Sequence, residues 1–261
     1  MSARVTYPTP YPDINAVLDV LLSAARAVLG PQLVGLYLHG SLASGDSEPG
    51  RSDVDFLVVT AAELPRETIV ALQAMHARIS ASGLPWATRL EGSYIPQQAL
   101  RRYDPARAWH PALRVDGSFG LDHHTSDWII QRHLIREQGL TLAGPKPRTL
   151  IDPILPDDLR RATVGILREW WEPQLQDHSR LLSSEYQSYA VLTMCRALYT
   201  LERGAVATKS VAARWAQERL GERWAALIAR ALAWRHGTSL QALDESLDLI
   251  RYTLERAQQS E

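Results

Sequence analysis

Hydrophobic positions follow two different periods along the first half of the chain. Apolar residues at helical spacing predict three helices, at residues 14–29, 65–82 and 127–137. Short apolar or alternating runs predict three strands, at residues 33–38, 55–60 and 88–95. The pattern over residues 96–121 is mixed and assigns no definite element there.

The second half of the chain is helical in period almost throughout. Five helices are predicted, at about residues 157–172, 184–203, 208–220, 222–236 and 239–258. Pro173, Gly204, Gly221 and Gly237 lie near their ends, as helix-terminating residues do. Strands interleaved with helices and followed by helices alone indicate an α/β or α+β domain with a helical domain behind it.

Composition excludes several classes of protein. The chain has 261 residues with 28 basic and 29 acidic side chains, which gives a net charge of −1 and no basic arm for nucleic acid or an anionic membrane. Its one cysteine, Cys195, excludes an internal disulfide framework and a multi-cysteine metal site. No apolar run is expected to reach the ~18 residues of a membrane span, so a soluble cytoplasmic protein is expected.

Polar residues follow the first strand and open the second. Gly40 and Ser41 come directly after residues 33–38, where Gly lets the backbone approach a phosphate and Ser adds a hydroxyl donor. Asp53 and Asp55 are two residues apart at the start of the next strand, so their side chains point to one face. Side by side they repel one another unless a cation such as Mg²⁺, shared with a triphosphate, is bound.

A third carboxylate, Glu91, lies in the third predicted strand. Alternation places it on the same face as Ser93 and opposite Tyr94. If this strand lies beside the second, Glu91 converges on Asp53 and Asp55, as a metal ligand or as a base that deprotonates an attacking hydroxyl. The alternative is an exposed carboxylate on a strand.

An Asp-x-Asp at a strand entrance is, taken alone, more often a solvated edge or a cap than a metal site. A lone Gly-Ser is weaker still. The combined pattern is more specific, because a strand, Gly-Ser, eleven residues and then Asp-x-Asp opening a second strand rarely arise by chance.

This pattern carries a resemblance to a known family. The segment L-H-G-S-L-A-S-G-(x6)-S-D-V-D-F-L-V resembles the nucleotidyltransferase signature, G-S-x-x-x-G followed by [SD]-D-x-D. T-K-S-V-A-A-R-W-A at 208–216 and V-L-T-M-C-R at 191–196 are similar to blocks of the aminoglycoside (3″)(9) adenylyltransferases. Asp127 stands eighteen residues before Pro145, as an acidic residue does in that family. The resemblance covers about residues 14 to 236.

The resemblance implies an α+β fold in two domains. Residues 1–152 would form a nucleotidyltransferase domain with a small mixed β-sheet and helices. Residues 153–261 would form an all-α helical bundle domain.

The resemblance also implies site residues. The ATP phosphates would be contacted by Gly40, Ser41 and Ser52. Two Mg²⁺ ions would be held by Asp53, Asp55 and Glu91, and Glu91 would also be the catalytic base. Asp127 would contact the nucleotide. Lys209 would reach the triphosphate with its compact charge; it and Lys146 are the two lysines of the chain. A solvated lysine in the first turn of a helix is the alternative for Lys209.

Departures from the family pattern fall where the acceptor would bind. Counting back from V-L-T, Tyr186 occupies the family's Asp position, and the neighbouring Glu185 could replace that carboxylate. A shift of one residue on a helix nevertheless rotates a side chain by about 100°. The family's substrate-contacting Trp corresponds to Trp170 or Trp171, and one of the two is expected in the helical core. Glu185, Tyr186 and Trp171 are therefore predicted to contact the acceptor.

The predicted activity is transfer of AMP from ATP to a hydroxyl of an aminoglycoside or aminocyclitol antibiotic, streptomycin or spectinomycin, with release of pyrophosphate. ATP and a small cationic acceptor are the expected partners of a monomer or weak dimer, with no stable nucleic-acid partner and no membrane. Two alternatives stay open: a nucleotidyltransferase for a protein, RNA or other small-molecule acceptor, and a non-catalytic ATP-binding sensor.

Overall fold

The structure, a computed structural model, describes residues 8–44 and 53–259 and forms two compact units. The sheet unit comprises Met1–His124 and Gln131–Pro153, and the helical unit comprises Thr125–Ile130 and Ile154–Glu261. The six residues Thr125–Ile130 therefore pack with the helical unit, although they precede most of it by more than twenty residues in sequence.

The sheet unit is built on six strands. They are β1 (Leu33–Leu38), β2 (Val54–Thr60), β3 (Leu90–Pro96), β4 (Trp109–Leu113), β5 (Phe119–His123) and β6 (Leu140–Ala143). Their order across the sheet is β5-β4-β3-β2-β1-β6, with β2 and β3 parallel and all other neighbours antiparallel. The mixed sheet and the three predicted strands are confirmed, and the segment 96–121 holds β4 and the start of β5.

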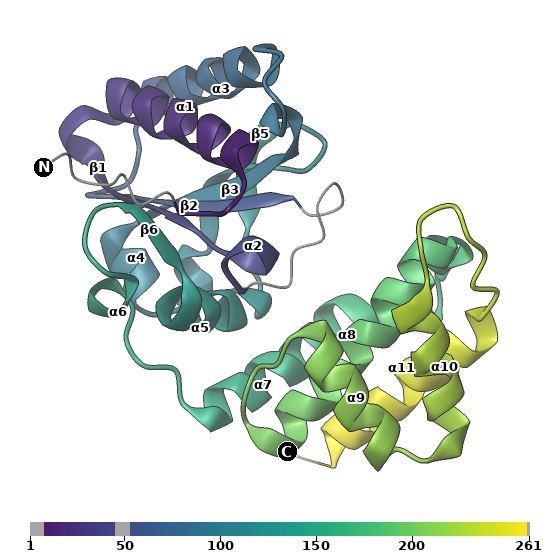
Figure 1. Cartoon of the computed structure of the whole chain (residues 1–261). Helices are drawn as coiled ribbons and strands as arrows, with labels where there is room; N and C mark the ends of the chain where they lie inside the picture. The colour runs from purple at the N-terminus through teal and green to yellow at the C-terminus, as the bar shows by residue number, and fades with distance from the viewer. Residues whose placement is uncertain (1–7, 45–52, 260–261) are drawn as a thin grey trace, which may run out of the picture. The chain divides into compact units, whose positions relative to one another are not determined.

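Helices cover both faces of the sheet (Figure 1). One face carries α1 (Pro12–Leu29) and α3 (Arg66–Ser80). The other carries α2 (Gly40–Ser44), α4 (Gln97–Arg101), α5 (Asp127–Gln138) and α6 (Pro147–Leu150). The core under α1 and α3 consists of aliphatic and aromatic side chains, whose removal from water stabilises the fold. On the strands, every second residue contributes to this core.

Helix α1 corrects one expectation from the sequence. The segment Pro12–Gln32 is long and apolar enough, by length and composition only, to cross a membrane, with a mean hydropathy of 1.4. The expectation that no segment would reach this length and hydropathy was therefore wrong. Ile14, Leu18 and Leu21 on this helix are nevertheless buried in the core of the sheet unit, as in an amphipathic core helix.

Strand alternation decides which side chains reach the site. Val54, Phe56 and Val58 point into the core beneath α1 and α3. Their neighbours on β2 therefore point to the opposite face, and so does Glu91 on β3. The predicted carboxylates thus stand on the face away from α1 and α3.

In the described part of the helical unit, five α-helices follow the sheet unit in sequence. They are α7 (Pro156–Ile166), α8 (Ser184–Arg203), α9 (Lys209–Arg219), α10 (Glu222–Ala233) and α11 (Leu243–Gln258). The first predicted helix ends earlier than expected, in a π-helical turn at Leu167–Trp171, and the last begins at Leu243 rather than 239. Their buried residues form one continuous core, in which burial raises the pKa of the Cys195 thiol to about 12.

Candidate functional site

The turn after β1 brings its backbone against a carboxylate. The His39 N–H donates to the backbone oxygen of Asp55 at 2.9 Å, which fixes the end of β1 beside the start of β2. Gly40 follows with φ = +67°, in the left-handed region that favours glycine. A Cβ built on Gly40 would collide with Oδ2 of Asp55 and lie 2.7 Å from its Cγ. Only glycine fits here, because the turn needs both the backbone conformation and the close approach.

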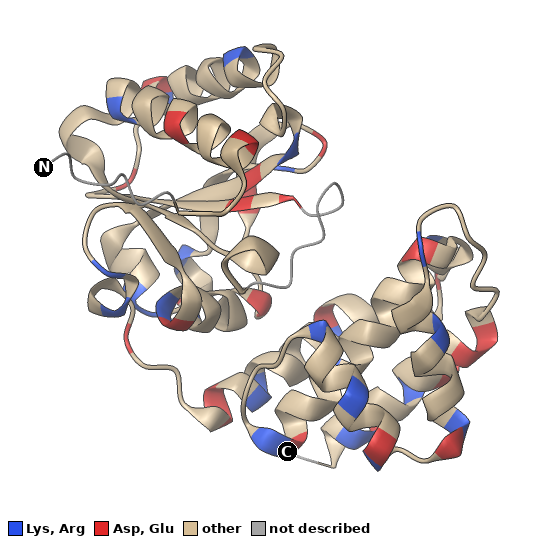
Figure 2. Ribbon diagram, in the orientation of Figure 1, with Lys and Arg blue, Asp and Glu red and all other residues tan. Residues whose placement is uncertain are grey.

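Three predicted carboxylates share this end of the sheet. In the parallel ladder, Asp55 on β2 lies opposite Glu91 on β3. Asp53 precedes Asp55 by two residues and interacts electrostatically with Glu91. Figure 2 shows the acidic positions on these central strands. The sequence analysis placed Glu91 near the two aspartates only if the third predicted strand lies beside the second. The pairing of β2 with β3 confirms that condition.

Burial and crowding shape the charge of this group. Burial raises the pKa of Glu91, and the nearby carboxylates of Asp53 and Asp122 raise it further. Burial also raises the pKa of Asp53, which the Arg89 guanidinium opposes. Asp122 on β5 forms an ion pair with Arg114 at 3.5 Å. The described part of the site thus concentrates negative charge that a cation would stabilise.

The donor set suits a magnesium ion shared with a nucleotide. Within residues 8–44 and 53–259, no group of three or more His, Cys, Asp and Glu side chains is arranged to hold a metal ion. Mg²⁺ commonly uses only one or two carboxylates and completes its shell with phosphate oxygens and water. Asp53, Asp55 and Glu91 fit that chemistry, and they do not form a closed metal cage.

Two serines are expected to contact the phosphates. Ser41 lies in α2, half-buried, and its carbonyl accepts a hydrogen bond from the Ser44 hydroxyl at 3.2 Å. Ser52 lies outside the described residues.

A buried polar pair extends the same face of the sheet, and sequence reasoning missed it. The Ser93 hydroxyl lies 3.1 Å from Nε2 of His124, whose ring centre is 4.8 Å from that of His110. Burial lowers the pKa of His110 to about 4 and that of His124 to about 2, so both are neutral near pH 7. Their positions depend on β4 and β5, which the mixed pattern of 96–121 did not reveal.

Asp127 belongs to the helical unit. It begins α5, and its carboxylate accepts a hydrogen bond from the Thr125 hydroxyl at 2.8 Å. The intervening Ser126 donates to Glu169 from its backbone N–H at 3.1 Å and from its hydroxyl at 2.8 Å. Burial raises the pKa of Asp127, and the hydrogen bond from the Thr125 hydroxyl lowers it. The Glu169 carboxylate raises this pKa by a smaller amount. The Ser126–Glu169 pair thus fixes Asp127 to the π-helical turn of the same unit.

An aromatic surface lies beside these carboxylates; we define it as Trp170, Tyr186 and Tyr189. The Trp170 indole N–H donates to the Tyr186 hydroxyl at 3.1 Å, and the Tyr186 and Tyr189 rings lie 5.4 Å apart. Trp170 is 45% exposed, whereas Trp171 is 1% exposed and packs beneath both tyrosines. The prediction for Trp171 is therefore corrected: it supports the surface from the core, and Trp170 is the tryptophan that a ligand can reach.

The remaining predicted residues also lie in the helical unit. Glu185 is exposed in the first turn of α8, beside Tyr186, whose N–H donates to the N-cap hydroxyl of Ser183 at 3.1 Å. Lys209 is the exposed first residue of α9 and follows its N-cap Thr208. The predicted contacts of Glu185 and Tyr186 with an acceptor stay predictions.

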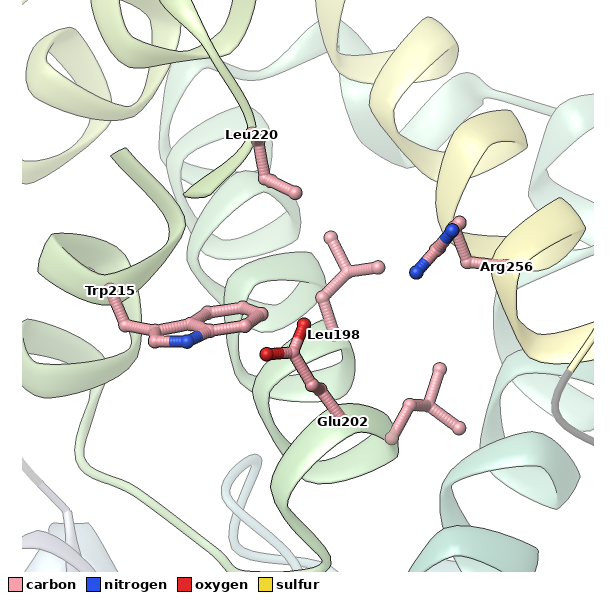
Figure 3. Close-up of a pocket in the computed structure, with 6 residues that line it drawn as sticks. Leu198, Glu202, Trp215, Leu220 and Arg256 are labelled. Carbon is pink, nitrogen blue, oxygen red and sulfur yellow. The ribbon is translucent and has the colours of Figure 1, made fainter. Parts of the chain in front are cut away.

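A separate small pocket in the helical unit contains none of the predicted residues. Figure 3 shows its lining from α8, α9 and α11, with Glu202 and Arg256 directed toward its apolar wall. Glu202 also pairs with Arg219 at 3.4 Å. We assign the pocket no role in the site.

Two family models match successive parts of the chain. The nucleotidyltransferase domain model matches residues 24–110, and the model of the aminoglycoside adenylyltransferase C-terminal domain matches residues 149–260. The chain therefore resembles the aminoglycoside adenylyltransferases in both of its parts. The chain is accordingly a nucleotidyltransferase. The resemblance to aminoglycoside adenylyltransferases and the fold class, both predicted from the sequence, are confirmed.

Individual members of the aminoglycoside adenylyltransferase family are distant in sequence. An aminoglycoside (3″)(9) adenylyltransferase of Shigella flexneri is 26% identical over 232 residues, which cover 84% of each chain. A spectinomycin 9-adenylyltransferase of Campylobacter jejuni is also 26% identical, over 82% of each chain. The crystal structure of a spectinomycin adenyltransferase from Enterococcus faecialis, with ATP and spectinomycin, shares the fold at a TM-score of 0.70 and 20% identity, covering 93% of this chain and 98% of that one.

The contact between Gly40 and Asp55 yields a prediction. In Gly40→Ala the new Cβ must displace the Asp55 carboxylate, and the positive φ adds strain of about 1–3 kcal/mol. We expect ATP binding in the presence of Mg²⁺, measured by calorimetry, to weaken by at least about tenfold, which corresponds to about 1.4 kcal/mol.

Gly83→Ala is the matched control for that experiment. Gly83 has φ = +73° and nothing within 4 Å of a built Cβ, so this variant carries backbone strain without a collision. It should lose some stability in a denaturant titration and keep its ATP affinity. Wild-type ATP affinity in Gly40→Ala would show that the close approach does not matter to the site.

Proposed function

We propose that this nucleotidyltransferase transfers AMP from ATP to a hydroxyl of an aminoglycoside or aminocyclitol and releases pyrophosphate. The observation that carries the proposal is the placement of Asp55 opposite Glu91, with Asp53 and the Gly40 turn beside them. Crowded carboxylates next to a phosphate-cradling turn suit a metal-bound triphosphate. The named activities of the distant relatives support the acceptor class.

The sheet unit would supply the chemistry at the α-phosphate. The backbone at Gly40 and the hydroxyls of Ser41 and Ser52 would bind phosphate oxygens. Asp53 and Asp55, with Glu91, would hold Mg²⁺, which neutralises charge on the triphosphate when bound. Glu91 would take the proton of the acceptor hydroxyl, since burial and two neighbouring carboxylates raise its affinity for a proton.

The helical unit would supply recognition of both substrates. Lys209 would pair with the triphosphate, and Asp127 would bind the nucleotide. The aromatic surface, with Glu185 beside it, would bind the acceptor, because aromatic faces and carboxylates both attract ammonium and guanidinium groups. The interspersed charges on both units (Figure 2) favour such a small acceptor over RNA, for which a basic surface would be expected.

The activity is tested by incubating the protein with ATP, Mg²⁺ and a panel that contains streptomycin and spectinomycin. We expect mass spectrometry to find at least one drug increased by the mass of AMP, with stoichiometric pyrophosphate. Glu91→Gln should lower kcat by about 10²–10⁴, the usual contribution of a general base, whereas the exposed Glu67→Gln should not.

The other outcomes of this experiment separate the alternatives. Pyrophosphate release without modification of any drug would indicate a protein, RNA or other small-molecule acceptor. Tight ATP binding without turnover would indicate a sensor. Either result would overturn the proposed acceptor class.

The two lysines provide an internal comparison. Lys209→Arg replaces a compact ammonium with a planar guanidinium. We therefore expect the KM for ATP to rise at least about tenfold, since loss of a well-placed charged hydrogen bond costs about 1.5–3 kcal/mol. Lys146→Arg, at the exposed N-cap of α6, should leave this KM unchanged. Equal KM values for the two variants and the wild type would exclude Lys209 from the triphosphate site.

A further inference from the structure

A side chain of the protein itself occupies the aromatic surface. The guanidinium carbon of Arg180 lies 5.0 Å from the ring centre of Trp170. Arg180 belongs to the short 3₁₀ helix Ser179–Leu182 and is exposed to solvent. Among the residues that the structure describes, no carboxylate forms an ion pair with it. Its side chain makes a cation–π contact with the indole face, and the exposed Asp177 carboxylate attracts it electrostatically without forming an ion pair.

The Trp170 ring is held so that it presents a face to a cation. Its N–H is used by the Tyr186 hydroxyl, which fixes the edge of the ring. The preceding residue, Glu169, is fixed by two hydrogen bonds from Ser126. Asp127 follows Ser126 and interacts electrostatically with both Glu169 and Tyr189. Two carboxylates thus lie close to residues of the aromatic surface, whose Trp170 face already holds a guanidinium.

We propose that Arg180 is an intramolecular competitor for the acceptor site, which occupies the Trp170 face until a cationic group of the acceptor displaces it. This inference rests on the proposed function, since it concerns the same acceptor. An ammonium or guanidinium of the acceptor and the Arg180 side chain need the same ring face and the same negative surroundings. An acceptor must therefore bind more tightly than the Arg180 side chain in order to displace it. This favours acceptors with several positive charges, because the neighbouring carboxylates bind the further charges while the ring binds one.

The competition is measured as binding, independently of AMP transfer. Calorimetry with streptomycin, which carries guanidinium groups, is performed on the full chain with Mg²⁺ and a non-hydrolysable ATP analogue. Removal of an exposed cation–π contact by Arg180→Ala should tighten streptomycin binding about two- to fivefold. Trp170→Ala should weaken it, and adding Arg180→Ala to Trp170→Ala should change it no further, because the contested ring is gone.

Arg223→Ala is the matched control. The Arg223 guanidinium lies 4.4 Å from the Trp224 ring centre at the start of α10, so this variant loses the same charge and the same kind of contact on the same unit. It also loses an ion pair with Asp248 at 2.8 Å, so its stability is measured alongside its affinity. It should leave streptomycin affinity unchanged, which separates local competition from a general effect of net charge.

Three results would overturn the inference: unchanged or weaker streptomycin binding in Arg180→Ala, equal tightening in Arg223→Ala, or no binding to either the wild type or Arg180→Ala. Failure of the proposed function gives a different result. Streptomycin that binds with the predicted pattern but receives no AMP would overturn the proposed activity and still support competition by Arg180.

Discussion

Repulsion among carboxylates on one face of a sheet is the constraint on which the site depends. The parallel pairing of β2 and β3 forces Asp55 and Glu91 into opposite positions, and strand alternation adds Asp53 to the same side. Nothing in the folding of the sheet requires acidic residues there. Burial raises the pKa of both Asp53 and Glu91, so their charged forms cost stability unless a cation is present. The Gly40 turn adds to the constraint, because its backbone touches Asp55 and leaves room for no side chain.

Much of this arrangement could be predicted from local sequence. The strand at 33–38, the Gly-Ser turn and the Asp-x-Asp pair are determined within a short segment, and alternation alone assigned the face of Glu91. The neighbour of β2 could not be predicted in the same way, because strand order depends on contacts between distant segments. The contribution of Asp122 was missed for a related reason: β4 and β5 are short and alternate irregularly, so 96–121 gave no clear period.

The aromatic surface formed by Trp170, Tyr186 and Tyr189 could be predicted only in part from the sequence. Periodicity could predict that one of two adjacent tryptophans faces the core, but not which one. The π-helical turn at Leu167–Trp171 departs from the 3.6-residue spacing and leaves Trp170 outside and Trp171 inside. The hydrogen bond between Ser126 and Glu169 joins residues 43 apart in sequence, so no local sequence pattern predicts it. Arg180 gave no signal at all, since a lone arginine in a polar stretch is ordinarily solvated.

We propose that the crowded carboxylates bind a metal–nucleotide complex. The most direct test is calorimetric titration of ATP into the wild type and Asp55→Asn, each with and without Mg²⁺, with Asp116→Asn at an exposed turn as the control. Mg²⁺ should strengthen ATP binding in the wild type and in Asp116→Asn, and it should have little effect in Asp55→Asn. Equal dependence on Mg²⁺ in all three proteins would contradict this proposal.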